Sequence, residues 1–381
     1  MQGPNKQETI CVHGASFFEK HTGAVSFPIY QSATFRHPAL GESTGYDYSR
    51  QQNPTREELE KTIANLEKAK FGFAFATGMA AITAALSLLK PGEHILATDD
   101  LYGGTVRLFN SIYSNYGITC SYVDTTDIEL VKKTLRENTK FIYIETPSNP
   151  MMKITEIQAI SKMAIERNIL TVVDNTFLSP IFLNPIELGA DIVVHSGTKY
   201  LGGHNDTLAG FVVTNKENLA EQVQFYQKAA GAGLAPFDSW LILRGIKTLA
   251  IRMQRQEENA LYLAEKLKAH PKVKKIFYPG LPTHPGKAIL EKEAKGYGAM
   301  ISFEVDSKET AENILRKVKL ILFAESLGGV ESLITYPMVQ THADVPLSQR
   351  EALGINERLL RLSVGIENKE DLLADLFQAL E

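Results

Sequence analysis

The sequence is poor in cysteine: its 381 residues contain only Cys11 and Cys120, which form neither a C-x-x-C pair nor a spacing typical of zinc ligands. A disulfide framework is therefore excluded, and the chain fits a reducing compartment. The first ten residues are polar and lack the apolar segment of a secretory signal. No apolar run reaches the ~20 residues that a bilayer-spanning helix needs. We therefore expect a cytoplasmic protein with no membrane partner.

An excess of one charge is also missing, because 40 Lys and Arg face 44 Asp and Glu, for a net charge of -4. No broad basic surface is available for nucleic acid. Neither a G-x-x-x-x-G-K-[ST] loop nor a G-x-G-x-x-G between a strand and a helix is present, which argues against nucleotide binding. With 44% hydrophobic and 22% charged residues, the composition is that of a globular protein of about two domains. Small molecules are the expected partners.

The chain divides into three predicted parts. Residues 1–52 contain turn formers and aromatics but no helical period, which predicts an extended arm without a fold of its own. Order begins at Asn53, where Thr55 and Glu58 have the spacing of a helix capping box. Residues 53–247 are expected to form a large domain and residues 248–381 a smaller α+β domain.

In the large domain, short apolar runs alternate with helical segments, which favours an α/β fold with a mostly parallel sheet covered on both faces. The runs read as continuous Val and Ile segments, as strands buried on both faces should. The predicted strands are 71–76, 94–97, 118–123, 140–144, 169–173 and 191–194. In the smaller domain we predict strands at 275–278, 300–305 and 359–364, and a closing helix over 369–380.

Lys199 is the first candidate for chemistry. It follows the apolar run that ends at Val194, with Ser196 and Thr198 just before it and glycines after it. An aldehyde cofactor needs an amine held at low dielectric, since desolvation lowers a lysine pKa and frees its lone pair. The two hydroxyl residues could bind a phosphate. Taken alone, however, Lys199 is more simply a loop lysine that faces water.

Two further strand ends strengthen this hypothesis. Asp174 lies at the carboxyl end of the run 169–173, where open α/β sheets bind ligands, and a protonated pyridine nitrogen would give it a cationic partner. The alternative is an aspartate in a turn or helix cap. At Gly78 and Met79 a strand turns directly into a helix, which aims free amides at an anion, although a tight turn would look the same. Together these features predict a phosphate site, a pyridinium partner and an amine at one edge of the sheet.

The segment Ser196-Gly-Thr-Lys199-Tyr-Leu-Gly-Gly resembles the cofactor-lysine motif of the Cys/Met-metabolism pyridoxal-phosphate enzymes. The resemblance covers nearly the whole chain and is closest to bacterial cystathionine γ-synthases. Its further motifs are Tyr46-Asp-Tyr48-Ser-Arg50-Gln-Gln-Asn53-Pro-Thr-Arg56, Tyr102-Gly-Gly-Thr, Glu145-Thr-Pro-Ser-Asn149-Pro, Val173-Asp174-Asn-Thr, Glu325-Ser326-Leu-Gly-Gly and Arg361-Leu-Ser-Val-Gly.

The resemblance implies a type I aminotransferase-like fold with pyridoxal 5'-phosphate bound to Lys199 as a Schiff base. It also implies a homotetramer, a dimer of dimers with shared active sites, in which Tyr48 and Arg50 reach the phosphate of the neighbouring subunit. Gly78, Met79, Ser196 and Thr198 would bind that phosphate within the chain.

The remaining roles also follow from the resemblance. Tyr102 would stack on the cofactor ring and assist Lys199, Asn149 would lie near the ring hydroxyl, and Asp174 would pair with the ring nitrogen. Arg361 would hold the substrate carboxylate. Substrate contacts would also come from Glu325, Ser326, Tyr48 and Arg107. Read singly, Tyr48 and Tyr102 could be interface or core aromatics, Arg361 a surface charge, and Arg107 and Asn149 could lie outside the site.

The expected reaction is γ-replacement, in which an O-acyl-homoserine and cysteine give cystathionine for methionine biosynthesis. Glu325 resembles the acid of many γ-acting members and favours γ over β chemistry. Gly104, where methionine γ-lyases carry cysteine, argues against that enzyme. A cystathionine γ- or β-lyase and then an O-acetylhomoserine sulfhydrylase are the alternatives, and a catalytically silent ligand-binding scaffold is the alternative of another class. His195, His204 and His342 are interpreted as structural, with no metal site.

Overall fold

A computed structural model describes residues 5–342 and 346–381, so residues 1–4 of the predicted arm and residues 343–345 of the predicted smaller domain lie outside it. The central sheet has seven strands in the order β1-β7-β6-β5-β4-β2-β3. They are β1 (Phe71–Phe75), β2 (His94–Thr98), β3 (Thr119–Val123), β4 (Thr139–Glu145), β5 (Leu170–Asp174), β6 (Ile192–Ser196) and β7 (Gly210–Thr214).

The strands from β2 to β6 pair in parallel, as the sequence predicts, whereas β7 pairs antiparallel with both β6 and β1. The sequence analysis did not include β7. This strand directly follows the loop after Lys199 and closes back on β6, with Ser196 opposite Gly210. The sheet is therefore mixed at one edge and parallel through the strands that end at the predicted site.

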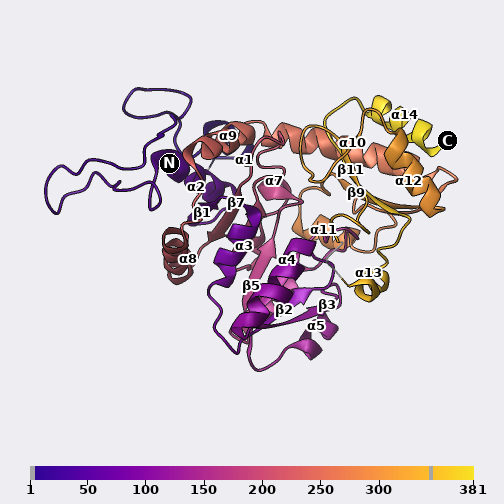
Figure 1. The fold of residues 1–381 in the computed structure, drawn as a ribbon, viewed down its shortest axis with the longest axis horizontal. Helices are drawn as coiled ribbons and strands as arrows, with labels where there is room; N and C mark the ends of the chain where they lie inside the picture. The colour runs from indigo at the N-terminus through magenta and orange to yellow at the C-terminus, as the bar shows by residue number, and fades with distance from the viewer. Residues whose placement is uncertain (1–4, 343–345) are drawn as a thin grey trace.

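Alternating side chains of the sheet contribute to two hydrophobic cores, one on each face, because successive residues of a strand point to opposite sides. Val173 and Val193 belong to one core, and Val172 and Val194 belong to the other. The first core is covered by α2 (Pro54–Leu66), α6 (Ile157–Ile165) and α9 (Pro236–Ile246), and the second by α3 (Gly78–Leu86) and α8 (Glu217–Ala230). The sheet lies between two layers of helices, which confirms the predicted α/β class (Figure 1).

The C-terminal part is a second sheet with helices. Its five strands follow the order β10-β11-β12-β9-β8, with bounds Val273–Phe277 (β8), Met300–Val305 (β9), Leu322–Phe323 (β10), Leu333–Thr335 (β11) and Leu359–Ser363 (β12). The long helix α10 (Leu249–Lys268) connects the two parts, and α14 (Lys369–Leu380) is the predicted closing helix. Between them lie α11 (Lys287–Glu293), α12 (Lys308–Lys317) and α13 (Leu347–Leu353). The predicted boundary at residue 247 falls between α9 and α10.

Two details of the N-terminal region differ from expectation. The arm contains one helix, α1 (Gln7–His13), before an irregular course that projects from the body in Figure 1. The predicted capping box is wrong, because Asn53 caps α2 by accepting from the amides of Thr55 and Arg56. Glu58 instead accepts from the amides of Ala15 and Ser16, which docks the arm on α2. A local sequence pattern cannot distinguish a cap from such a distant partner.

The remaining helices are short and lie between strands: α4 (Gly103–Arg107), α5 (Ile128–Thr134) and α7 (Ser179–Phe182), with further single turns at Leu108–Ile112, Tyr113–Tyr116 and Pro185–Leu188. Within residues 5–342 and 346–381, no helix combines the length and the apolar character needed to cross a bilayer.

Candidate active site

A cavity of about 370 Å³ lies where the carboxyl ends of β4, β5 and β6 meet the start of α3 and the C-terminal sheet. Every site residue predicted from the sequence lines this cavity, except Tyr48 and Arg50. Those that line it are Gly78, Met79, Tyr102, Arg107, Asn149, Asp174, Ser196, Thr198, Lys199, Glu325, Ser326 and Arg361. The fold therefore brings residues that are almost 300 positions apart in the chain around one space.

Lys199 follows β6 and donates a hydrogen bond from Nζ to Oγ of Ser326, 2.8 Å away. Desolvation and the nearby charge of Arg361 lower the pKa of Lys199 to about 8, although the carboxylate of Glu325 opposes the shift. At pH 7 about a tenth of this amine is therefore uncharged and nucleophilic, far more than for an ordinary lysine. The alternative of an ordinary water-facing lysine is wrong.

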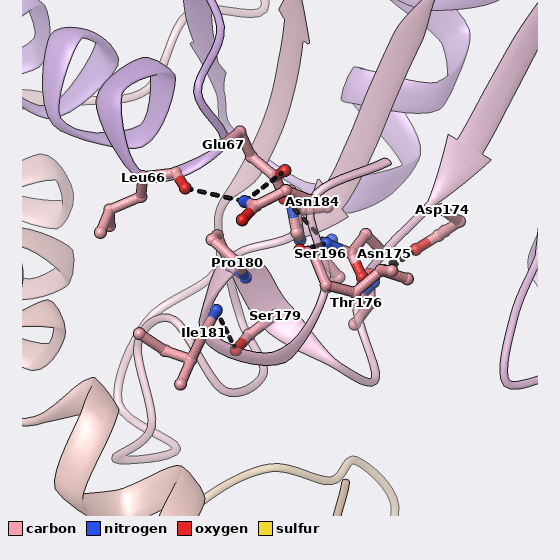
Figure 2. Close-up of polar contacts among 12 residues, drawn as sticks. Leu66, Glu67, Asp174, Asn175, Thr176, Ser179, Pro180, Ile181, Asn184 and Ser196 are labelled. Atoms are coloured by element: carbon pink, nitrogen blue, oxygen red, sulfur yellow. Dashed lines mark hydrogen bonds and ion pairs between the residues drawn. The ribbon is translucent and has the colours of Figure 1, made fainter. Parts of the chain in front are cut away.

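Asp174 ends β5 and is buried. Its Oδ1 accepts from the amide and the hydroxyl of Thr176 at 3.0 and 2.6 Å, and its Oδ2 accepts from the hydroxyl of Tyr143 at 3.3 Å. The expectation of a turn aspartate is therefore also correct, since the contacts with Thr176 close a turn (Figure 2). Burial raises the pKa of Asp174, and the bonds from Thr176 oppose the rise. A cationic ligand would stabilise this buried carboxylate.

An anion site is formed by the first turn of α3. Thr77 caps the helix by accepting from the amide of Ala80 at 3.0 Å, and the amides of Gly78 and Met79 belong to the first turn, which has no intrahelical acceptors. A Cβ on Gly78 would lie 3.0 Å from Cβ of Ser196, so glycine allows the helix to approach β6 closely. The hydroxyl groups of Ser196 and Thr198 line the same cavity.

Arg361 lies on β12 and is only 2% exposed, so the alternative of a surface charge is wrong. Its Nη1 donates to Oδ1 of Asn149 at 2.9 Å, and its Nη2 donates to the carbonyl of Ser326 at 3.3 Å. Burial lowers the pKa of Arg361 to about 10, and Nε is buried without a hydrogen-bond partner among the described residues. A carboxylate would satisfy this guanidinium in charge and in hydrogen bonds.

Glu145 is a cavity residue to which the sequence analysis assigned no role. It ends β4 beside Asp174 in the register of the sheet, and its Oε2 accepts from the amide of Tyr102 at 3.0 Å. Burial and then the charge of Asp174 raise the pKa of Glu145 well above its usual range. The sequence contained a signal for this role, because Glu145, like Asp174, is an acid at the carboxyl end of an apolar strand. It holds the start of α4 and thereby the place of Tyr102.

Tyr48 and Arg50 do not line the cavity. Arg50 donates from Nη1 to the carbonyl of Lys228 at 2.6 Å, and its guanidinium carbon lies 5.7 Å from the ring centre of Tyr48. Both side chains are exposed. Within one chain, the arm therefore leaves these two residues outside the site.

The histidines interpreted as structural have protein partners. His195 Nε2 lies 2.6 Å from a carboxylate oxygen of Glu67, and His342 Nε2 lies 2.9 Å from the carbonyl oxygen of Asn149. His204 Nδ1 lies 2.8 Å from the carbonyl oxygen of Gly202. No group of three or more His, Cys, Asp or Glu in the described part of the chain could hold a metal ion.

The cavity residues fit pyridoxal phosphate group by group. The start of α3 with Ser196 and Thr198 suits a phosphate, Asp174 suits a protonated ring nitrogen, and the desolvated amine of Lys199 suits an aldehyde. The partly unsatisfied guanidinium of Arg361 remains for the carboxylate of an amino-acid substrate.

Comparisons with known proteins agree with this site. A cystathionine γ-lyase of Bacillus subtilis (strain 168) is 48% identical over 99% of this chain and 99% of its own. A cystathionine β-lyase of Lactococcus lactis subsp. cremoris is 49% identical over 98% of each chain. The structure of cystathionine γ-synthase from Xanthomonas oryzae pv. oryzae, in complex with aminoacrylate and cysteine, superposes with a TM-score of 0.97 at 40% identity over 99% of this chain and 98% of that one. The family model for Cys/Met metabolism PLP-dependent enzymes matches residues 8–381, and the chain belongs to this pyridoxal-phosphate-dependent family of transsulfuration enzymes.

Proposed function

We propose that this enzyme makes cystathionine by γ-replacement, in which cysteine displaces the acyl group of an O-acyl-homoserine. The observation that carries the proposal is the presence of Glu325 in the same cavity as Lys199 and Arg361. A carboxylate there can bind the ammonium group of a second amino acid, while Arg361 binds the carboxylate of the first. A site of this composition suits a reaction that joins two amino acids.

When bound, the cofactor withdraws electrons from Cα of the substrate and so acidifies its proton. The residues of the chain supply the proton transfers. The Lys199 amine, whose pKa is lowered by desolvation, is the acid/base that takes the proton from Cα and then acts at Cβ. Ser326, which accepts a hydrogen bond from Nζ, restrains the position of this amine, and Tyr102 lines the same cavity.

Asp174, Gly78, Met79, Ser196 and Thr198 are proposed to hold the cofactor, and Asn149 to contact the ring hydroxyl. Arg107 lines the cavity and is proposed to border the substrate channel. Binding and orientation of the substrate come from Arg361, whose guanidinium is itself oriented by Asn149. Such support keeps the carboxylate clamp in one place while Cγ reacts.

A second candidate is the cleavage of cystathionine at its γ or β carbon. The same two charges, on Arg361 and Glu325, would hold the two ends of cystathionine as a substrate. The two relatives named above with 48% and 49% identity bear lyase names, which favours this candidate. Replacement with sulfide, the reaction of a sulfhydrylase, would use the same cavity without needing Glu325.

A homotetramer with shared active sites is also part of the proposal. The arm exposes large apolar side chains, and monomers rarely expose many of them together. They include Phe17, Phe18, Val25 and Leu40, with exposed fractions from 53% to 106%. Contact with another copy of the chain would bury these side chains and could bring Tyr48 and Arg50 to the neighbouring cavity.

Product analysis tests the proposed reaction. Purified, cofactor-loaded enzyme receives O-acetyl- or O-succinyl-homoserine with cysteine, or with sulfide, and in a separate reaction cystathionine alone; Lys199→Ala is the blank. We expect cystathionine to form faster than any keto acid. Rapid keto acid from cystathionine, with little replacement, would instead establish a lyase, and the co-product, homocysteine or cysteine, would identify the β or γ carbon. A wild-type protein without turnover on any of these would be a silent scaffold.

A further inference from the structure

A buried polar cluster lies behind the ends of β5 and β6, on the side of the sheet away from the cavity. Its centre is Glu67, the residue after α2, whose carboxylate accepts from Nδ2 of Asn175 at 2.8 Å and from Nδ2 of Asn184 at 3.4 Å. His195 Nε2 lies 2.6 Å from the same carboxylate. The side chains of Glu67 and His195 are 0% and 1% exposed, so this pair is removed from water.

The cluster and the cavity use alternate residues of the same two strand ends. Asp174 and Ser196 line the cavity, whereas the next residue along, Asn175, and the preceding one, His195, contact Glu67. This is the period of two expected of extended backbone. Figure 2 shows Glu67 and Asn184 grouped near Asn175, which follows Asp174, the last residue of β5.

Three hydrogen bonds connect the cluster around Glu67 with the cavity side of the same strand ends. The amide of Asn175 donates to the carbonyl of Val194 at 3.1 Å. The amide of Ser196 donates to Oγ1 of Thr176 at 2.9 Å, and this hydroxyl donates to Oδ1 of Asp174 at 2.6 Å. A displacement of His195 would therefore move the Ser196 amide and, through Thr176, the Asp174 carboxylate.

The charges of the cluster also bear on Asp174. The carboxylate of Glu67 is fully buried, and His195 and two asparagine amides supply its hydrogen-bond partners. The described acids that face His195 are Glu67 from the end of α2 and Asp174 from β5. Burial raises the pKa of Asp174, the bonds from Thr176 lower it, and the positive charge of His195 lowers it further. The cluster thus favours an ionised Asp174.

We propose that His195, held by Glu67, is a positioning residue for Asp174: it keeps the ends of β5 and β6 in register and thereby fixes the carboxylate that would face the ring nitrogen of the cofactor. The sequence analysis interpreted His195 as structural. This role depends on membership of the pyridoxal-phosphate family and not on which carbon–sulfur reaction the enzyme performs.

The test replaces His195 by Gln, which keeps a hydrogen-bond donor for Glu67 but cannot place it where the imidazole ring does. The holoenzyme is loaded with cofactor labelled with 15N at the ring nitrogen, and the 15N resonance is recorded beside kcat and KM. We expect the resonance to move from the pyridinium position toward that of neutral pyridine. We also expect kcat to fall roughly 10- to 100-fold, as for other residues that orient a primary contact, with KM changed less than about threefold.

Two further variants separate this role from a general loss of stability. Glu67→Gln/His195→Gln also removes the buried carboxylate, so none is left without its partner and the protein should fold. It should still show the shifted resonance and the lower kcat. His94→Gln is the matched control, since His94 is fully buried in the same sheet, at the opposite end of a strand, where Nδ1 lies 2.9 Å from Oγ1 of Thr139. A folded double variant with the wild-type resonance and kcat, like the His94 control, would overturn the proposal.

Discussion

The cavity and the N-terminal arm hold their predicted residues in different ways. In the cavity, several residues lie at a point where an element begins or ends: Asp174 ends β5, Gly78 starts α3, and Lys199 follows β6 by three residues. In the arm, Tyr48 and Arg50 lie in an irregular segment and are exposed to solvent. The main chain of the sheet positions the first group, and the described chain does not bring the second group to the cavity.

This difference shows which part of the active site one chain can assemble alone and which part it cannot. Parallel strands bring their carboxyl ends to one edge, so residues far apart in sequence converge without help from a partner. An arm with exposed Phe17, Phe18 and Leu40 has no such support and needs a surface to lie on. We therefore expect changes in the cavity to act within a subunit and changes in the arm to act between subunits.

The largest effect is expected in the cavity from Asp174→Asn. The amide keeps the size of the side chain but cannot compensate a positive ring nitrogen, so turnover should fall roughly 10³-fold while the cofactor still binds. Turnover and the visible absorbance of the bound cofactor, measured on the same preparation, check this. Near-normal turnover would contradict the role of Asp174 and would mean that this cavity residue is not needed for the reaction.

The second-largest effect is expected from Arg361→Ala, on the KM for the amino-acid substrate. Loss of a buried guanidinium that pairs with a carboxylate should raise KM for the amino-acid substrate about 100-fold, with a smaller change in kcat. Steady-state kinetics measure both constants. Arg358→Ala is the matched control, since Arg358 lies just before the same strand but is only partly buried and pairs with Glu304. Equal KM values for the two variants would exclude Arg361 from the substrate site.

The pH dependence of cofactor capture should test the cavity residue Lys199. Desolvation, followed by the charge of Arg361, lowers the pKa of Lys199 to about 8, so the neutral amine that attacks an aldehyde predominates above that pH. The rate at which the apoprotein captures the cofactor, followed by visible absorbance, should rise about tenfold per pH unit below pH 8 and level off above it. Nα-acetyl-lysine amide in solution, the control, has only the side-chain amine and should continue to gain rate beyond pH 9. A capture rate that also continues to rise would mean that Lys199 has an ordinary pKa.

The smallest effect tests the arm. Arg50→Ala and Lys199→Ala should each be inactive alone, because one lacks a phosphate contact in trans and the other lacks the amine. If subunits mix at random into dimers with shared sites, about a quarter of the wild-type activity should return, since half of the dimers carry one intact site of two. Activity is measured after the subunits are unfolded together and refolded. A mixture with no activity would place Arg50 at the site of its own subunit, whereas an Arg50→Ala variant that is active alone would place Arg50 outside the site.

Much of the fold followed from periodicity in the sequence. The alternation of apolar runs and helices predicted six strands of the central sheet, and the acid and the lysine at their ends predicted the site. The antiparallel strand β7 was missed, as was α1. Glu145 was quoted in a motif but given no role, because its importance arises from its position beside Asp174 across the sheet and from its bond to the Tyr102 amide.

The sequence by itself determined the α/β class and the placement of Lys199 and Asp174 at strand ends, because local hydrophobic period and short motifs encode strands, their ends and the residues placed there. Only the tertiary structure decided which of these ends are neighbours, that Arg361 is buried beside Asn149, and that Glu67 pairs with His195 behind the site. These contacts join residues more than 100 positions apart. They depend on the order of the strands and on the face to which each side chain points, and no local segment of the sequence determines either of these.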